Sequence, residues 1–170
     1  MKTALLAALL TAAAIPARAE IAIAGLSWQT SSGKGAFGAA ERWDPAAGAK
    51  GGSRVRAVAT LENRGAVSEG LCVLRYAVSV RFARAKETGE GAWAVPFLSE
   101  ETHVPLPIKP GQKKDVPVAV NRVALEGYLR RFQRLGFRAD ALRIQVMVEP
   151  RAGEALKDRV VESTLPVGPK

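Results

Sequence analysis

Cysteine and histidine are almost absent from this 170-residue sequence, which contains one of each. With Cys72 alone, no disulfide bond can form within the chain, and no thiolate zinc site can be assembled from it. A single histidine, His103, excludes a histidine-cluster metal site, and no Gly-x-Ser-x-Gly motif accompanies it. We therefore predict no metal, no cofactor and no catalytic residue, with Cys72 packed in the core as a small apolar residue and His103 on the surface. Carboxylates in turns leave a glycosidase-type acid and base open, although solvated charge is the simpler interpretation.

Long apolar segments are also scarce, and the only one lies at residues 4–15. It follows a single lysine and precedes Ala-Arg-Ala, which is the pattern of a secretory signal peptide over residues 1–19. The next residue is Glu20 rather than the cysteine of a lipoprotein anchor. We expect one soluble mature domain, residues 20–170, without a transmembrane segment, in a bacterial periplasm or secreted. Nucleic acid is not an expected partner at that location.

The charge balance is basic, with 25 Lys and Arg against 16 Asp and Glu and a formal net charge of +9. Such a surplus favours anionic partners or surfaces, and it is equally compatible with an ordinary basic exported protein.

Short runs of alternating apolar residues, separated by glycine, proline and asparagine turns, follow the predicted signal peptide and are typical of a β-sandwich. The clearest run covers residues 71–84, where Tyr76, Val78 and Val80 would face the core. A break in the alternation near Gly25 suggests a β-bulge. We predict a mainly β sandwich of about eight strands, at residues 21–28, 54–62, 71–84, 93–97, 104–108, 116–120, 142–149 and 160–167.

A single helical signal covers residues 121–135 and predicts one helix packed on the sheets. Asn121 is a good N-cap and Gly136 a good residue to end the helix. Its apolar positions form one stripe, made of Leu125, Tyr128, Leu129, Phe132 and Leu135.

Residues 31–53 are rich in glycine and alanine, and we interpret them as a mobile loop. Phe37 and Trp43 stand out within it. Aromatic side chains on a mobile loop can close on a ligand or partner surface, so both are candidate binding residues. The alternative is that both fold back and cap an open end of the sandwich.

The other candidates for binding are Arg130, Arg131 and Arg134, which lie opposite the apolar stripe of the predicted helix. Together they could bind phosphate or carboxylate groups of an anionic polymer or lipid head group. Alternatively, they favour the helix dipole, and Glu126 is placed four residues before Arg130 for an ion pair. Outward-facing basic residues on the predicted strands could extend a positive sheet face, namely Arg54, Arg56, Arg75, Arg81 and Arg143.

Two segments carry a resemblance to known proteins. Residues 55–65 form a strand that closes on Asn-Arg-Gly, and residues 108–118 form a Pro-Gly turn followed by an alternating valine strand. Over residues 54–149 the chain resembles the immunoglobulin-like sandwiches of bacterial cell-envelope proteins, including CARDB-type adhesion modules. The predicted helix departs from that pattern. The resemblance implies an immunoglobulin-like fold and a non-catalytic binding or assembly role, and it transfers no functional residue.

We therefore expect an exported, non-enzymatic module of the cell envelope that mainly contacts a protein partner. A second hypothesis is that the helix arginines bind anionic envelope polymers or lipids. A third is an enzyme or enzyme inhibitor that uses the loop at residues 31–53.

Overall fold

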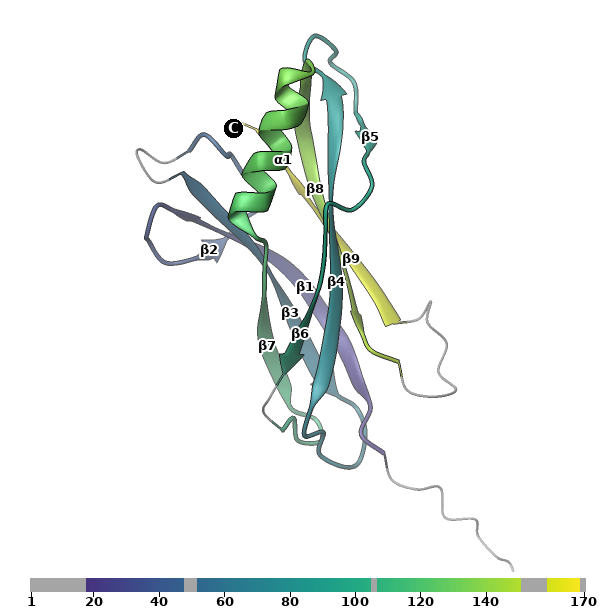
Figure 1. Cartoon of the computed structure of the whole chain (residues 1–170). Coiled ribbons are helices and arrows are strands. Elements are labelled where there is room, and N and C mark those ends of the chain that lie inside the picture. The colour runs from purple at the N-terminus through teal and green to yellow at the C-terminus, as the bar shows by residue number, and fades with distance from the viewer. Residues whose placement is uncertain (1–17, 48–51, 105–106, 151–158, 169–170) are drawn as a thin grey trace, which may run out of the picture.

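Two antiparallel β-sheets packed face to face form the described part of the protein, together with one helix that connects a strand of one sheet to a strand of the other (Figure 1). The structure is a computed structural model that describes residues 18–47, 52–104, 107–150 and 159–168. Most of the predicted signal peptide lies outside these residues. Within the described residues, no helix combines the length and apolar character needed to cross a membrane.

The first sheet has the strand order β2-β1-β3-β7. Its strands are β1 (Ile21–Ser32), β2 (Gly38–Ala39), β3 (Ser53–Asn63) and β7 (Lys113–Ala119). β1 pairs with β3 along its whole length, and the register shifts between Ile23 and Gly25. The β-bulge predicted near Gly25 is thus confirmed.

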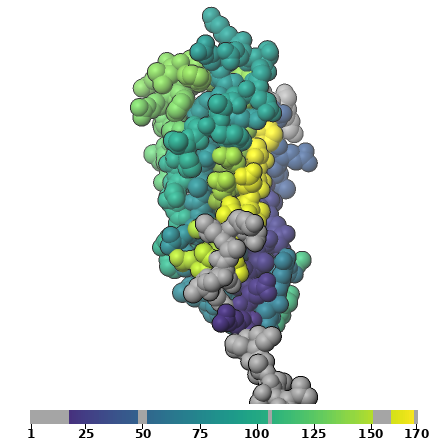
Figure 2. All heavy atoms as spheres, turned by 90° about the vertical axis from the view of Figure 1, so that its right-hand side faces the viewer, coloured from purple at the N-terminus to yellow at the C-terminus, as the bar shows by residue number. Residues whose placement is uncertain are grey.

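The second sheet is built around β4, which pairs with β8 on one side and with both β5 and β6 on the other, while β9 pairs with β8. Its strands are β4 (Cys72–Arg84), β5 (Ala92–Trp93), β6 (Leu98–Val104), β8 (Phe137–Val148) and β9 (Val160–Pro166). β9 lies beside β1, where the edges of the two sheets meet (Figure 2).

The predicted mainly β sandwich with one helix is confirmed, with nine strands in the described residues. The prediction was wrong at residues 93–97, where the strand β5 covers Ala92–Trp93 and does not continue. Pro96 lacks a backbone N–H and cannot continue a regular ladder. Instead the polar segment Leu98–Val104 pairs with β4 as an exposed edge strand. The prediction was also wrong at residues 104–108, because β6 ends at Val104, residues 105 and 106 lie outside the described part, and Ile108 forms only an isolated bridge with Glu69.

The core lies between the sheets and follows the predicted alternation. On β4, Tyr76 is 4% exposed, and Val78 and Val80 are fully buried. On β3, Ala57 and Leu61 are also fully buried. Burial of these side chains from both sheets supplies the main stabilising free energy of the fold.

Asn63 closes one end of the sandwich and has no exposed surface. Its Oδ1 accepts hydrogen bonds from the N–H groups of Glu20 (3.2 Å) and Gly65 (3.0 Å). Its Nδ2 donates to the carbonyl oxygens of Val67 and Ile108, both at 2.8 Å. The predicted Asn-x-Gly turn is present, and its asparagine also joins three other segments of the chain.

The helix α1 (Arg122–Arg134) connects β7 to β8, as the capping residues predict. The side chain of Asn121 accepts a hydrogen bond from the N–H of Ala124 at 3.1 Å. Gly136 adopts a φ of +81°, the left-handed conformation that favours glycine after a helix. Leu135 departs from the predicted stripe: it is 65% exposed because it is the C-cap, where helical periodicity ends.

An aromatic cluster holds α1 on the second sheet. The rings of Phe132 and Phe82 are stacked, with their centroids 4.1 Å apart. Tyr128 stacks on Phe97 at 4.9 Å and contacts Phe82 at 5.7 Å. The predicted packing of the helix through its apolar stripe is therefore confirmed for Tyr128 and Phe132.

The segment from 31 to 53, predicted as one mobile loop, contains more regular structure than its composition suggests. β1 extends to Ser32, the chain returns to pair with β1 through β2, and β3 begins at Ser53. Trp43 donates its backbone N–H to the carbonyl oxygen of Pro166 at 2.9 Å. Residues 48–51 lie outside the described part. The described ends of this segment are ordered because they pair with β1 and with the end of β9.

Candidate functional site

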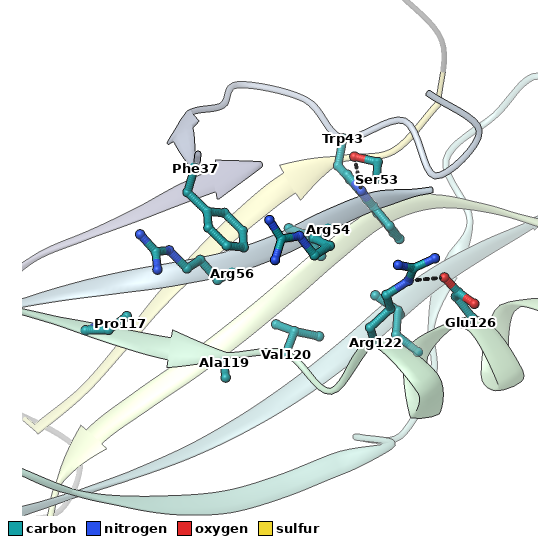
Figure 3. A pocket seen from close by; sticks show the side chains of 12 residues that line it. Phe37, Trp43, Ser53, Arg54, Arg56, Pro117, Ala119, Val120, Arg122 and Glu126 are labelled. Atoms are coloured by element: carbon teal, nitrogen blue, oxygen red, sulfur yellow. Dashed lines mark hydrogen bonds and ion pairs between the residues drawn. The ribbon is translucent and has the colours of Figure 1, made fainter. Parts of the chain in front are cut away.

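An open groove of about 320 Å³ lies where β3, the segment after β1 and the start of α1 meet (Figure 3). We call it the β3–α1 groove. Its lining residues are Phe37, Trp43, Ser53, Arg54, Val55, Arg56, Pro117, Ala119, Val120, Arg122, Leu125 and Glu126.

The groove exists because β7 ends before it reaches the first residues of β3. The last pair in the register joins Arg56 to Ala119, after which the chain turns into α1 at its N-cap, Asn121. Ser53, Arg54 and Val55 still pair with β1 on their other side. They have no strand partner on the β7 side among the described residues, which leaves this edge of β3 facing the groove.

The inner wall of the groove is apolar. Val55 and Val120 are 6% and 7% exposed, and Leu125 and Trp43 are each 2% exposed. The indole Nε1 of Trp43 donates to Oγ of Ser53 at 3.1 Å, so the ring is held against the beginning of β3. Trp43 thus contributes to the wall of the groove and to the core, rather than standing free on a loop.

The rim of the groove carries two arginines from β3 beneath the ring of Phe37 (Figure 3). Nε and Nη2 of Arg56 both donate to Oε1 of Gln29, at 2.9 and 2.7 Å. Nη2 of Arg54 donates to Oγ of Ser31 at 3.1 Å and to the carbonyl oxygen of Gly35 at 2.8 Å. These neutral partners orient the two cations without neutralising their charge.

A third arginine, Arg122, enters the groove from the first turn of α1. Its Nε donates to Oε1 of Glu126, one helical turn later. A Cβ on Gly52, which has a φ of +63°, would lie 2.7 Å from Nη2 of Arg122. A glycine there lets the guanidinium group lie against the start of β3.

The electrostatic balance of the groove is positive. Three guanidinium groups line it against one carboxylate, Glu126, which is already paired with Arg122. Neither Arg54 nor Arg56 forms an ion pair with a carboxylate of the described residues. Arginine N–H groups form charge-assisted hydrogen bonds with carboxylates, so the arrangement suits a ligand with a carboxylate beside an apolar group.

The predicted binding residues fall into two places. Phe37 and Trp43 line the β3–α1 groove. Arg130, Arg131 and Arg134 are exposed on α1 and do not line it. Glu126 pairs with Arg122 instead of with Arg130, the partner that sequence spacing suggested.

The outward-facing arginines do not form one positive face, because strand order separates them. Arg54 and Arg56 belong to the sheet of β3, whereas Arg75, Arg81 and Arg143 belong to the sheet of β4 and β8. The three arginines of the second group also contact side chains of their own sheet or of the loops beside it. Arg75 pairs with Glu149 at 2.9 Å, Arg81 pairs with Asp140 at 2.7 Å, and the guanidinium carbon of Arg143 lies 4.4 Å from the centre of the Trp93 ring.

The two residues singled out by their scarcity lie away from the groove. Cys72 is buried in the core, and burial raises the pKa of its thiol. His103 is exposed on β6, with its Nε2 3.4 Å from Oε1 of Glu101. In the described ranges, no group of three or more His, Cys, Asp and Glu side chains is placed to hold a metal ion.

Sequence reasoning missed Ser53, Val55 and Arg122 as lining residues, and it treated Arg54 and Arg56 only as part of a sheet face. No local motif marks them, since they become neighbours only when α1 packs beside the end of β3. The positive φ of Gly52 could not be predicted either, because residues 31–53 contain several glycines and nothing in the sequence distinguishes this one.

The fold defines the protein as a mainly β two-sheet sandwich with one helix. No protein-family model matches the chain, and no curated protein sequence matches it. Among solved structures, it is similar to a region of the β-D-glucoside glucohydrolase of Trichoderma reesei, with a TM-score of 0.44 and 16% sequence identity. That match covers 90% of this chain and 19% of the fungal protein. The likeness concerns the arrangement of strands and does not bear on activity.

Proposed function

We propose that this chain is an exported, non-enzymatic binding module of the bacterial cell envelope, which takes a protein partner in the β3–α1 groove. The observation that carries the proposal is the grouping of three arginines around an apolar hollow, at an edge of β3 that has no strand partner among the described residues. The partner would place an apolar side chain against Val55 and Leu125 and a carboxylate near Arg54 and Arg56.

Two sequence features support the setting of this proposal. The signal-peptide pattern at residues 1–19 supports export. The resemblance of residues 54–149 to immunoglobulin-like envelope modules of the CARDB type supports binding or assembly rather than catalysis.

The shape of the groove supports a protein partner over a small molecule. Its volume of about 320 Å³ is at the lower limit of ligand pockets, which bury most of a small ligand's surface. Pro117 and Ala119, which form its outer side, are exposed. A shallow hollow bounded by a strand edge suits a side chain and a short backbone stretch of a larger partner.

The test is site-specific photo-crosslinking in the native cell. A photoreactive p-benzoylphenylalanine replaces Ala119, which is exposed in the groove, or Val95, which is 79% exposed elsewhere, as the matched control. We expect one discrete cross-linked protein from position 119, none from position 95, and loss of the product in an Arg54→Gln/Arg56→Gln variant. The same product from both positions, or a product insensitive to the arginine substitutions, would contradict the proposal.

A second candidate function rests on α1. Arg130, Arg131 and Arg134 are exposed together, and none forms an ion pair with a carboxylate of the described residues. Such a cluster could hold anionic polymers or lipid head groups of the envelope by charge alone.

A further inference from the structure

We infer that the partner's contact segment is an extended acidic peptide that adds to the free edge of β3 as an antiparallel strand, in line with β7. The inference rests on the proposed function, since it specifies what enters the β3–α1 groove. It names both the backbone contact and the order of side chains in the bound segment.

The backbone groups of β3 face the groove at alternate residues. The backbone N–H of Asn63 donates to the carbonyl oxygen of Gln112, on the β7 side. The carbonyl oxygen of Gly52 accepts from the backbone N–H of Gly33, on the β1 side. Because these groups alternate sides along a strand, odd-numbered residues of β3 point toward β7. Ser53 and Val55 therefore direct backbone hydrogen-bonding groups toward the side that β7 no longer occupies.

β7 itself agrees with this assignment. Pro117, which has no N–H, lies opposite Val58, an even-numbered residue that faces β1. Val118 lies opposite Ala57, an odd-numbered residue that faces β7. An added segment would continue the pairing that the chain itself breaks off at Ala119.

The side chains around the edge specify an alternating ligand. Four consecutive residues of β3, Ser53 to Arg56, line the groove. Their side chains alternate between the two faces of the sheet, so the groove follows the edge of the strand rather than one sheet face. Val55 points inward beside the apolar wall, while Arg54 and Arg56 point outward beneath Phe37. In an antiparallel pair, side chains directly opposite one another lie on the same face. The added strand would alternate apolar residues on the inner face with acidic residues on the outer face.

Charge complementarity favours acidic rather than basic residues on that outer face. Nε of Arg54 is buried and has no hydrogen-bond partner among the described residues, and Arg56 uses its fork on the neutral Gln29. A carboxylate at this position would add charge-assisted hydrogen bonds to both guanidinium groups. Main-chain pairing would supply affinity, and the alternating pockets would supply specificity.

The experiment uses the peptide acetyl-Leu-Glu-Leu-Glu-amide, labelled with a fluorophore, and the purified chain. Its leucines would lie opposite Val55 and Ser53, because the place opposite Arg56 is already taken by Ala119. In the antiparallel register the leucine amides face β3 and the glutamate amides face away. We expect N-methylation of both leucine amides to weaken binding at least tenfold, and N-methylation of two glutamate amides to change it less than twofold. Both methylated peptides are tested on the unmodified protein, so no variant has to fold.

A variant pair tests the charge contribution. Arg56→Gln should weaken peptide binding severalfold, whereas Arg84→Gln, which changes an arginine with a 73% exposed side chain on the other sheet, should leave it unchanged. Equal binding by the two methylated peptides, or a greater loss from methylated glutamate amides, would overturn antiparallel strand addition. Absence of binding by the unmodified peptide would also overturn it, while a position-119 cross-link would still support the proposed function.

Discussion

The ring of Phe37 lies over the guanidinium group of Arg56, with 4.1 Å between the guanidinium carbon and the ring centroid. The guanidinium carbon of Arg54 lies 4.9 Å from the same centroid. One aromatic residue after β1 therefore holds two cations of β3 at the rim of the groove. It links the segment that carries β2 to the strand edge where we propose that a partner binds.

Phe37→Ala should release both arginines and weaken the partner contact. Because cation–π pairs at partly exposed sites contribute about 0.5–1 kcal/mol each, we expect a loss of stability of about 1 kcal/mol. The cross-link from position 119 should fall severalfold, as measured by its yield at equal protein expression. Phe37→Leu is the control that keeps apolar volume but removes the ring. A cross-link as strong in both variants as in the unmodified protein would show that the ring has no part in binding.

The exposed helix arginines permit a separate test. Replacing Arg130, Arg131 and Arg134 by glutamine should change the free energy of unfolding by no more than about 1 kcal/mol, because exposed charges contribute little to folding. Cosedimentation with vesicles rich in anionic lipid at low salt should weaken severalfold if this face binds anions. Arg84→Gln is the single-charge control. Equal cosedimentation of the triple variant and the unmodified chain would remove the second candidate function.

Phe132→Ala should destabilise the fold by about 3 kcal/mol, because it removes a ring stacked on Phe82 and leaves a cavity beneath α1. Val123→Ala on the same helix is the control. Val123 is 78% exposed, so its change should stay within about 0.5 kcal/mol. Urea denaturation of both variants measures the difference. A small effect at Phe132 would mean that α1 contributes little to the stability of the sandwich.

Tyr76 should make the free energy of unfolding depend on pH in the alkaline range. Burial raises the pKa of Tyr76 to about 12 from an ordinary value of 10.0, and the hydrogen bond from its hydroxyl to Oε2 of Glu100 adds to the rise. Below pH 10 the hydroxyl stays protonated in both the folded and unfolded states, so its contribution is fully present. As pH rises from 10 toward 12, the unfolded state ionises first, and the contribution is lost.

The measurement is urea denaturation of the unmodified chain and of Tyr76→Phe at pH 8, 10 and 11.5. The free-energy difference between the two proteins should shift in favour of Tyr76→Phe above pH 10. Absorbance at the tyrosinate band should show the ionisation of Tyr76 delayed in the folded protein. A constant difference across the three pH values would show that Tyr76 ionises as freely in the folded chain as in the unfolded one.

Local patterns in the sequence were sufficient for most of the secondary structure. The alternation through Tyr76, Val78 and Val80 identified the buried face of β4, because successive side chains of a strand point to opposite faces. Asn121 and Gly136 marked the ends of α1, because capping chemistry is local to those residues. Each of these features depends on neighbours within a few positions along the chain.

The β3–α1 groove depended on tertiary structure alone. It requires β7 to end opposite Arg56, α1 to pack across the end of β3, and Phe37 to fold back over two arginines. Strand order likewise separated Arg54 and Arg56 from the arginines of the other sheet. Alternation along one strand says which face a side chain occupies, but the neighbouring strand is chosen by packing between distant segments. The sequence by itself therefore determined most of the strands, the helix and the buried faces, while the tertiary structure decided the edge strands β2 and β6 and which charges and rings share a surface.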